Sequence, residues 1–142
     1  MPSRFSVRVL PWTEALALAR PVREAVFIIE QRVPRELEWD EWDARSDHAL
    51  AVDENGRAIG TARLLPDGRI GRMAVLKEQR GTGVGAALLQ TLLARARARG
   101  MTRITLHAQT HAAGFYRRFG FSARGGELFE AGIPHLEMAL DL

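Results

Sequence analysis

The sequence contains no cysteine, which excludes disulfide bonds, thiolate metal sites and a cysteine nucleophile. It also lacks any apolar run approaching the roughly 20 residues that cross a bilayer. The first ten residues do not contain the apolar core of a signal peptide. We therefore expect a cytoplasmic protein that does not bind membranes.

Lysine is almost absent, because Lys77 is the only lysine among the 20 basic residues and the rest are arginines. The formal net charge of +3 is too small to indicate nucleic-acid binding by itself. With 142 residues, of which 46% are hydrophobic and 26% charged, the composition is ordinary for one soluble globular domain. We expect that domain to span residues 1–142.

Acidic residues are missing from residues 80–126, whereas residues 30–54 are rich in them. The first segment contains eight arginines: Arg80, Arg95, Arg97, Arg99, Arg103, Arg117, Arg118 and Arg124. The segregation predicts that one part of the protein meets an anion and the other a cation. Solvated faces that happen to differ in charge would produce the same pattern.

The first half of the chain indicates a strand, two helices and a strand meander. Phe5, Val7 and Val9 alternate with polar residues, as in a strand. Two helices are expected next, the first capped by Thr13 and the second starting with Pro21 in its first turn. Pro34 ends the second helix, and the acidic residues 35–47 form a loop. Residues 48–76 then hold three strands, joined by turns at residues 55–56 and 67–68.

The second half predicts a helix from Gly85 to Gly100, a strand over residues 102–108, a short helix over 112–119 and a final strand over 135–142. With one further strand between the short helix and the final strand, the expected element order is βααβββαβαββ. Such an order is typical of a mixed α/β fold of the α+β type, in which helices flank a largely antiparallel central sheet.

Three alternate glycines, Gly81, Gly83 and Gly85, separate the third meander strand from the following helix. A glycine-rich turn at a helix N-terminus exposes backbone N–H groups and therefore predicts an anion site. A dinucleotide-binding loop would follow the first strand of a parallel βαβ unit and would have an acid about 20 residues later, which this chain lacks. A Walker A loop would need a Lys-Ser or Lys-Thr pair after Gly85.

Read as Arg80-x-x-Gly83-x-Gly85 after the strand RMAV, the loop resembles motif A of the GNAT superfamily of N-acetyltransferases. Downstream, the segment HAQTHAAGFYRRFGF resembles the second signature of that superfamily, an aromatic-rich segment closed by Gly-Phe. The stretches EQRVP, LHAQ and EAGIPHLEM are similar to those of a bacterial YjcF-like subgroup. The resemblance covers nearly the whole chain.

The resemblance implies the GNAT-like acyl-CoA N-acyltransferase fold and acetyl-CoA as cosubstrate, with no metal. It places the pyrophosphate on the glycine-rich loop and the pantetheine arm along the preceding strand. Gln109, where the superfamily often has Asn, and the adjacent aromatics would also lie beside the cofactor. The implied cofactor-binding residues are Met73, Ala74, Val75, Arg80, Gly81, Thr82, Gly83, Val84, Gly85, Ala86, Gln109, Phe115 and Tyr116.

The implied reaction is direct attack of a primary amine on the thioester. Tyr116, the chain's only tyrosine, matches the tyrosine that protonates the leaving thiolate, and a phenol is protonated at neutral pH. For a general base, Glu30 and His107 are candidates, and Glu127 and His135 are conceivable. A chain of waters would make a dedicated base unnecessary.

Two other functions are consistent with parts of the sequence. A non-catalytic acyl-CoA-binding module would need the same loop but not Tyr116. Nucleic-acid binding would use Arg95, Arg97 and Arg99, but on a helix these spread over about 200° and form no single stripe. We expect no nucleic-acid partner. We expect the acceptor to be a cationic amine that is bordered by the acidic residues 30–47. A homodimer is one assembly in which we expect the protein.

Overall fold

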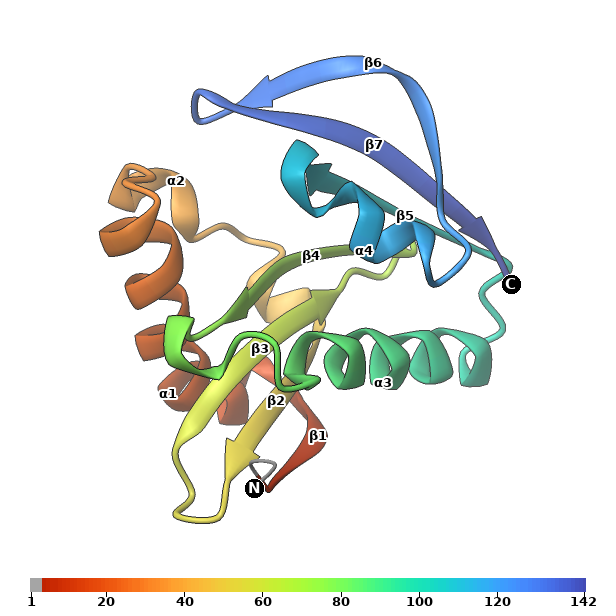
Figure 1. Cartoon of the computed structure of the whole chain (residues 1–142). Coiled ribbons are helices and arrows are strands. Elements are labelled where there is room, and N and C mark those ends of the chain that lie inside the picture. Colours follow the sequence, from red (N-terminus) through yellow and green to blue (C-terminus); the bar gives the residue numbers. More distant parts are fainter. Residues whose placement is uncertain (1–3) are drawn as a thin grey trace.

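The computed structural model describes residues 4–142. Seven strands in this range form one sheet in the order β1-β2-β3-β4-β5-β7-β6, and the β4–β5 pair is parallel while the others are antiparallel (Figure 1). The strands are β1 (Phe5–Pro11), β2 (Asp47–Asp53), β3 (Ala58–Leu64), β4 (Arg69–Val75), β5 (Arg103–Gln109), β6 (Ser122–Glu130) and β7 (Ile133–Asp141). The expected largely antiparallel α/β fold is confirmed.

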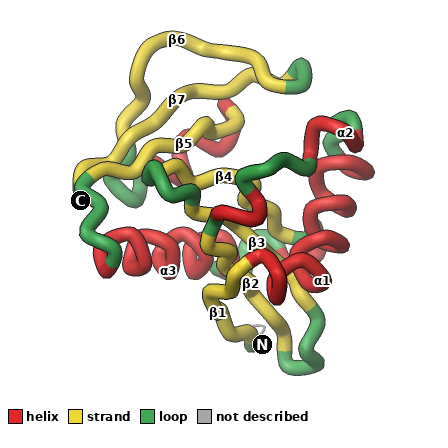
Figure 2. Tube along the Cα trace, turned by 180° about the vertical axis from the view of Figure 1, so that it is seen from behind, coloured by secondary structure: helices red, strands yellow, loops and turns green. Residues whose placement is uncertain are grey.

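Helices cover both faces of the sheet. The helical segments are α1 (Trp12–Arg23), the π-helix η1 (Glu24–Glu30), α2 (Arg35–Glu38), α3 (Val84–Ala98) and α4 (Ala113–Arg117), with 3₁₀ turns η2 (Asp43–Arg45), η3 (Lys77–Gln79) and η4 (Thr110–Ala112). Helix α1 packs Ala15 and Ala19 against Leu50 of β2. Helix α3 lies on the opposite face, where a Cβ on Gly60 of β3 would meet Val84 (Figures 1 and 2). The sheet is therefore the middle layer of three.

The two expected early helices are one continuous helical segment. Helix α1 begins at Trp12 with Pro11 at its N-cap, so the prediction of Thr13 as the cap is wrong. Pro21 lies inside α1 and does not start a second helix. Its φ is compatible with helix and its ring is exposed, so the chain accepts the loss of one N–H donor. The segment then widens into η1, where the Gln31 amide donates to the Val26 carbonyl five residues earlier at 3.0 Å.

The later elements match the expected ones closely. Gly83, with φ of 90°, is the N-cap of α3, and Gly100, with φ of 78°, follows its C-cap. The expected loop over residues 35–47 contains two helical turns, α2 and η2. Across residues 4–142, no helix has the length and apolarity needed to cross a bilayer.

Candidate functional site

Strands β4 and β5 form a fork. Across the described residues, their parallel pairing consists of two positions, Arg69 with Thr105 and Ile70 with Leu106. Just beyond, Arg72 has a positive φ of 50°, which is uncommon for a residue with a Cβ. Its guanidinium donates to the carbonyls of Glu38 at 3.2 Å and Leu37 at 3.3 Å, which anchors this bend. The two strands therefore separate at the ends that follow Ile70 and Leu106.

The edge of β4 along this fork provides main-chain groups. On its other edge, Ala74 and Val75 pair with Thr61 and Gly60 of β3. Toward β5, residues 73–75 have no paired strand within residues 4–142. An extended molecule can therefore add to this edge as a further strand would, through backbone hydrogen bonds.

The glycine-rich loop joins the end of β4 to α3. Gly81 and Gly83 have φ values of 80° and 90°, which residues with a Cβ rarely adopt. No side chain caps the first turn of α3, so its amides and the positive end of the helix dipole are directed at the loop. This arrangement suits an anion.

Gly85 differs from the other two glycines of the loop. A Cβ at this position would lie 3.6 Å from the Phe115 ring and 3.9 Å from Val75, which are ordinary van der Waals distances. The packing of α3 against α4 and β4 would therefore accept an alanine here.

Arg80 connects the loop to the end of η1. Its guanidinium donates to both carboxylate oxygens of Glu30, at 2.6 and 2.7 Å, and its Nε donates to the Val75 carbonyl at 3.1 Å. The hydrogen bonds from Arg80 lower the pKa of Glu30, against a smaller opposing effect of burial. Glu30 is thus held as a carboxylate with both oxygens in use, which disfavours it as the general base.

Tyr116 reaches across the fork from α4. Its hydroxyl donates to Met73 Sδ at 3.6 Å, and Met73 lies on β4. Its ring packs edge-on against Phe115 and Phe121, with centroids 5.0 and 6.0 Å away. Burial raises the pKa of Tyr116 to about 12, because the phenolate would lose its hydration. The hydroxyl is therefore a proton donor over the whole neutral range.

Gln109 ends β5 and bonds to Gln31 at the end of η1. The side-chain amide Nε2 of Gln109 donates to the side-chain oxygen Oε1 of Gln31 at 2.8 Å. The pair links the helix end to β5 on the open side of the fork. In the sequence, Gln31 stands out only as part of the EQRVP stretch, and nothing there indicates its contact with Gln109.

Two of the remaining base candidates come together on the β5–β7–β6 part of the sheet. His107 on β5 and His135 on β7 both face Glu130 at the end of β6, at 2.9 and 3.6 Å. Glu127 does not join them. It pairs with Leu136, one position out of phase with the Leu128–His135 pair, so it lies on the opposite face.

Arginines from other parts of the chain bind several carboxylates of the acidic residues 30–47. Glu38 and Asp43 are each 2% exposed, and both accept from Arg23 at 2.7 Å. Arg63 donates to Asp40 at 2.7 Å and to Asp43 at 2.8 Å. Burial raises the pKa of Glu38 even so. These three carboxylates bind arginines and are not available to attract an acceptor.

The tryptophans of this segment also pack against arginines. The Trp39 ring lies 4.6 Å from the Arg23 guanidinium, and the Trp42 ring lies 4.7 Å from that of Arg45. Both distances are typical of cation–π contacts. Packing against arginine therefore accounts for both rings without an acceptor.

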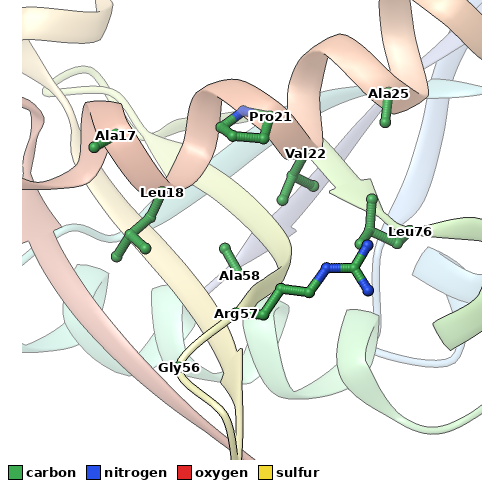
Figure 3. Close-up of a pocket in the computed structure, with 9 residues that line it drawn as sticks. All are labelled: Ala17, Leu18, Pro21, Val22, Ala25, Gly56, Arg57, Ala58 and Leu76. Carbon is green, nitrogen blue, oxygen red and sulfur yellow. The ribbon is translucent and has the colours of Figure 1, made fainter.

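Two surface pockets lie outside the fork. Figure 3 shows the larger, of about 240 Å³, between α1 and the β2–β3 turn. It is lined mainly by apolar side chains with Arg57 as its one charged group, and it includes neither Tyr116 nor the glycine loop. The second, of about 220 Å³, lies beside Trp12 and Trp39. Neither contains the fork residues, and we place the candidate site at the fork because the open edge of β4, the glycine-rich loop and the Tyr116 hydroxyl come together there. Within residues 4–142, no group of three His, Asp or Glu side chains is arranged to hold a metal ion.

Comparisons with known proteins identify similar sequences and structures. Residues 15–142 match the family described as "Acetyltransferase (GNAT) domain". The chain is 39% identical over 132 residues to an uncharacterized N-acetyltransferase, YjcF, of Bacillus subtilis, covering 90% of this chain and 94% of that protein. Among solved structures, it is similar to a putative N-acetyltransferase from Lactobacillus plantarum, with a TM-score of 0.87, 29% identity, and 97% and 98% of the two chains covered. It is also similar to an acyl-CoA N-acyltransferase from Pseudomonas aeruginosa, with a TM-score of 0.85, 28% identity, and coverage of 96% and 99%.

Proposed function

The chain belongs to the GNAT acetyltransferase family, and we propose that it transfers an acetyl group from acetyl-CoA to a primary amine by direct attack on the thioester. The observation that carries this proposal is the position of Tyr116. A buried, protonated hydroxyl reaches Met73 across the fork, beside a strand edge and a loop that together suit an acyl-CoA.

The cosubstrate would lie along β4 and the loop. The amides of residues 80–86 would bind its pyrophosphate, because the positive φ of Gly81 and Gly83 turns the backbone toward an anion at the start of α3. The pantetheine arm would add to β4 at residues 73–75. Gln109 and Phe115 would flank the arm from β5 and α4. The acetyl thioester would then lie in the fork, near the Tyr116 hydroxyl.

The reaction requires the chain to position the two substrates and to supply one proton. As the amine nitrogen forms its bond to the carbonyl carbon and the carbon–sulfur bond breaks, the thiolate takes the Tyr116 proton. The nitrogen loses a proton after attack, and this proton restores the phenol directly or through solvent. A positioned acid of this kind contributes roughly 10²–10⁴-fold to the rate.

The acceptor is proposed to be a cationic amine. Fewer acidic side chains support this proposal than the sequence of the chain indicated. Five acids of the segment are bound by arginines, namely Glu30, Glu38, Asp40, Asp43 and Asp47. Within residues 4–142, the exposed Glu36 and Glu41 have no such ion pair and remain to attract a cation. Their effect acts over a distance and is screened by salt.

The test is thiol release from acetyl-CoA with matched cationic, neutral and anionic amines at two ionic strengths. Turnover with any amine supports acetyl transfer. Preference for a cationic amine that weakens as salt rises supports the acceptor class, and preference for an anionic amine contradicts it. Tight acetyl-CoA binding without turnover of any amine would instead favour a non-catalytic acyl-CoA-binding module.

A further inference from the structure

Three strands bring two histidines to one carboxylate. His107 comes from β5, His135 from β7 and Glu130 from the β6 end of the β6–β7 hairpin. His107 Nδ1 lies 2.9 Å from Glu130 Oε2, and His135 Nε2 lies 3.6 Å from Glu130 Oε1. The two oxygens of a single carboxylate therefore face two different imidazoles.

The hydrogen bonds orient both rings. Glu130 as a carboxylate only accepts, so His107 must donate from Nδ1, and in the neutral ring Nε2 then carries the lone pair. His135 donates from Nδ1 to the Ile133 carbonyl at 2.7 Å, which fixes the direction of its ring. A carboxylate that holds the Nδ1–H of a histidine leaves Nε2 able to accept a proton.

His107 is the first residue of β5 beyond the part that pairs with β4. Leu106 is the last β5 residue paired with β4, and His107 follows it directly. Leu106 and Ala108 are buried in the same apolar cluster as Tyr116. Because strand side chains alternate, His107 projects from the other face, as does Gln109, which bonds to Gln31. His107 and Tyr116 thus approach the fork from opposite faces of the sheet.

The tip of the β6–β7 hairpin lies on the same side of the molecule as α2 in both views (Figures 1 and 2). This side is open to solvent at the cluster, since the side chains of His107 and Glu130 are 24% and 47% exposed. An amine that reaches the thioester from this side meets the His107–Glu130 pair before it meets the fork.

We propose that His107 is the general base that deprotonates the acceptor ammonium, and that Glu130 is the residue that positions it. The inference rests on the acetyl transfer proposed above. The ammonium gives one proton to His107 Nε2, and the resulting imidazolium is paired with Glu130. The neutral nitrogen then attacks the thioester, and His107 returns its proton to solvent after product leaves.

Other charged groups around His107 are few. Glu137 of β7 lies opposite it in register, and Arg124 of β6 lies opposite Glu137. Across the fork, Arg72 is engaged with Glu38 and Asp40. Glu30 is held by Arg80. These groups affect the electrostatic potential at His107. Within residues 4–142, the side chain that hydrogen-bonds to the His107 ring is Glu130 and none of these groups.

The experiment measures kcat/KM against pH for His107→Gln, Glu130→Gln and a matched control, His111→Gln, whose histidine is exposed on η4. We expect kcat/KM to fall by roughly 10²–10⁴ in His107→Gln, with loss of the acidic limb of the profile. Glu130→Gln should fall by roughly tenfold or more and displace that limb. His111→Gln should behave as the wild type.

The outcomes separate the two proposals. A wild-type enzyme that turns over an amine, with His107→Gln keeping both its rate and its acidic limb, would overturn the base assignment alone. A wild type that binds acetyl-CoA but turns over no amine would overturn acetyl transfer, and the base with it. Circular dichroism and melting temperature check that each variant is folded, and the exposed Glu130 provides a second variant if His107→Gln is not.

Discussion

The guanidinium of Arg80 binds both carboxylate oxygens of Glu30, at 2.6 and 2.7 Å. We expect Glu30→Gln to retain the acidic limb of the pH–rate profile, because a carboxylate with both oxygens bound is a poor base. Its pKa in the folded protein lies below the ordinary 4.5. The pair therefore stabilises the fold above that pH and ceases to do so as pH falls through the lower value.

Because the pair is partly exposed, the loss of stability at pH 7 should be about 1 kcal/mol or less. Urea unfolding of Glu30→Gln and wild type at pH 7 and pH 3 measures it, and the difference should shrink at pH 3. Loss of the acidic limb in Glu30→Gln would restore Glu30 as the base.

Gly83→Val should abolish the stabilisation of the protein by acetyl-CoA. Wild type should gain about 2.7 kcal/mol when acetyl-CoA is present at a hundred times its Kd, and NAD or ATP should stabilise it far less. Gly100→Val is the matched control, because Gly100 has a similar φ at the other end of α3 and a Cβ on either glycine meets no atom within 4 Å. Thermal unfolding with and without each ligand measures the effect. A retained acetyl-CoA shift in Gly83→Val would place the phosphate site elsewhere.

Tyr116→Phe should lower kcat by roughly 10²–10⁴ while leaving the affinity for CoA nearly unchanged. The ring and its contacts with Phe115 and Phe121 are kept, and the removed hydroxyl has only the weak acceptor Met73 Sδ in the structure of residues 4–142. Stability should therefore stay the same or rise slightly. Single-turnover kinetics separates the chemical step from product release. An unchanged chemical step would assign the proton on the thiolate to water.

Arg23→Met should destabilise the protein by about 3–5 kcal/mol, because it removes the 2.7 Å partner of two buried carboxylates and leaves Glu38 with Arg72 at 3.6 Å and Asp43 with Arg63. Arg20→Met is the matched control on the same helix. Arg20 is exposed and pairs with Glu24 at 3.0 Å, so its loss should cost about 0.5 kcal/mol. Urea unfolding measures both. Equal effects would mean that the buried cluster does not hold α1 to α2.

Local signals predicted the parts of the fold that local chemistry determines. The turns at Gly56 and Gly68, the loop at Gly81 and Gly83, and the helix that follows are all fixed by positive φ or by helical periodicity within a few residues. The prediction that Pro21 starts a second helix is wrong. A proline is usual at a helix start, but its effect inside a helix depends on whether the surroundings compensate for the lost hydrogen bond.

Contacts between distant residues explain what the sequence did not reveal. The sequence predicts that the acids of residues 38–43 border a cationic acceptor, because it does not show that their partners Arg23 and Arg63, 15 to 23 residues away in the chain, bind them. The proximity of Glu130 to His107 is not visible in the sequence, because a register shift between Arg124 and Glu127 decides how far along β7 Glu130 lies. A bulge of this kind leaves no reliable trace in the sequence.

The π-helical segment gives the chain a tolerance to the loss of one residue that an α-helix would not have. Its turns contain an extra residue, and Glu30 and Gln31 stand at its end. Deleting one residue from it would allow ordinary helical turns, and because an α-helix turns further per residue than a π-helix, the shortened segment would turn through about the same total angle. Glu30 would then still face Arg80, and Gln31 would still face Gln109. Among relatives of this chain, a one-residue gap at this segment would therefore mark proteins that have an ordinary α-helix here and attach it to the fork in the same way.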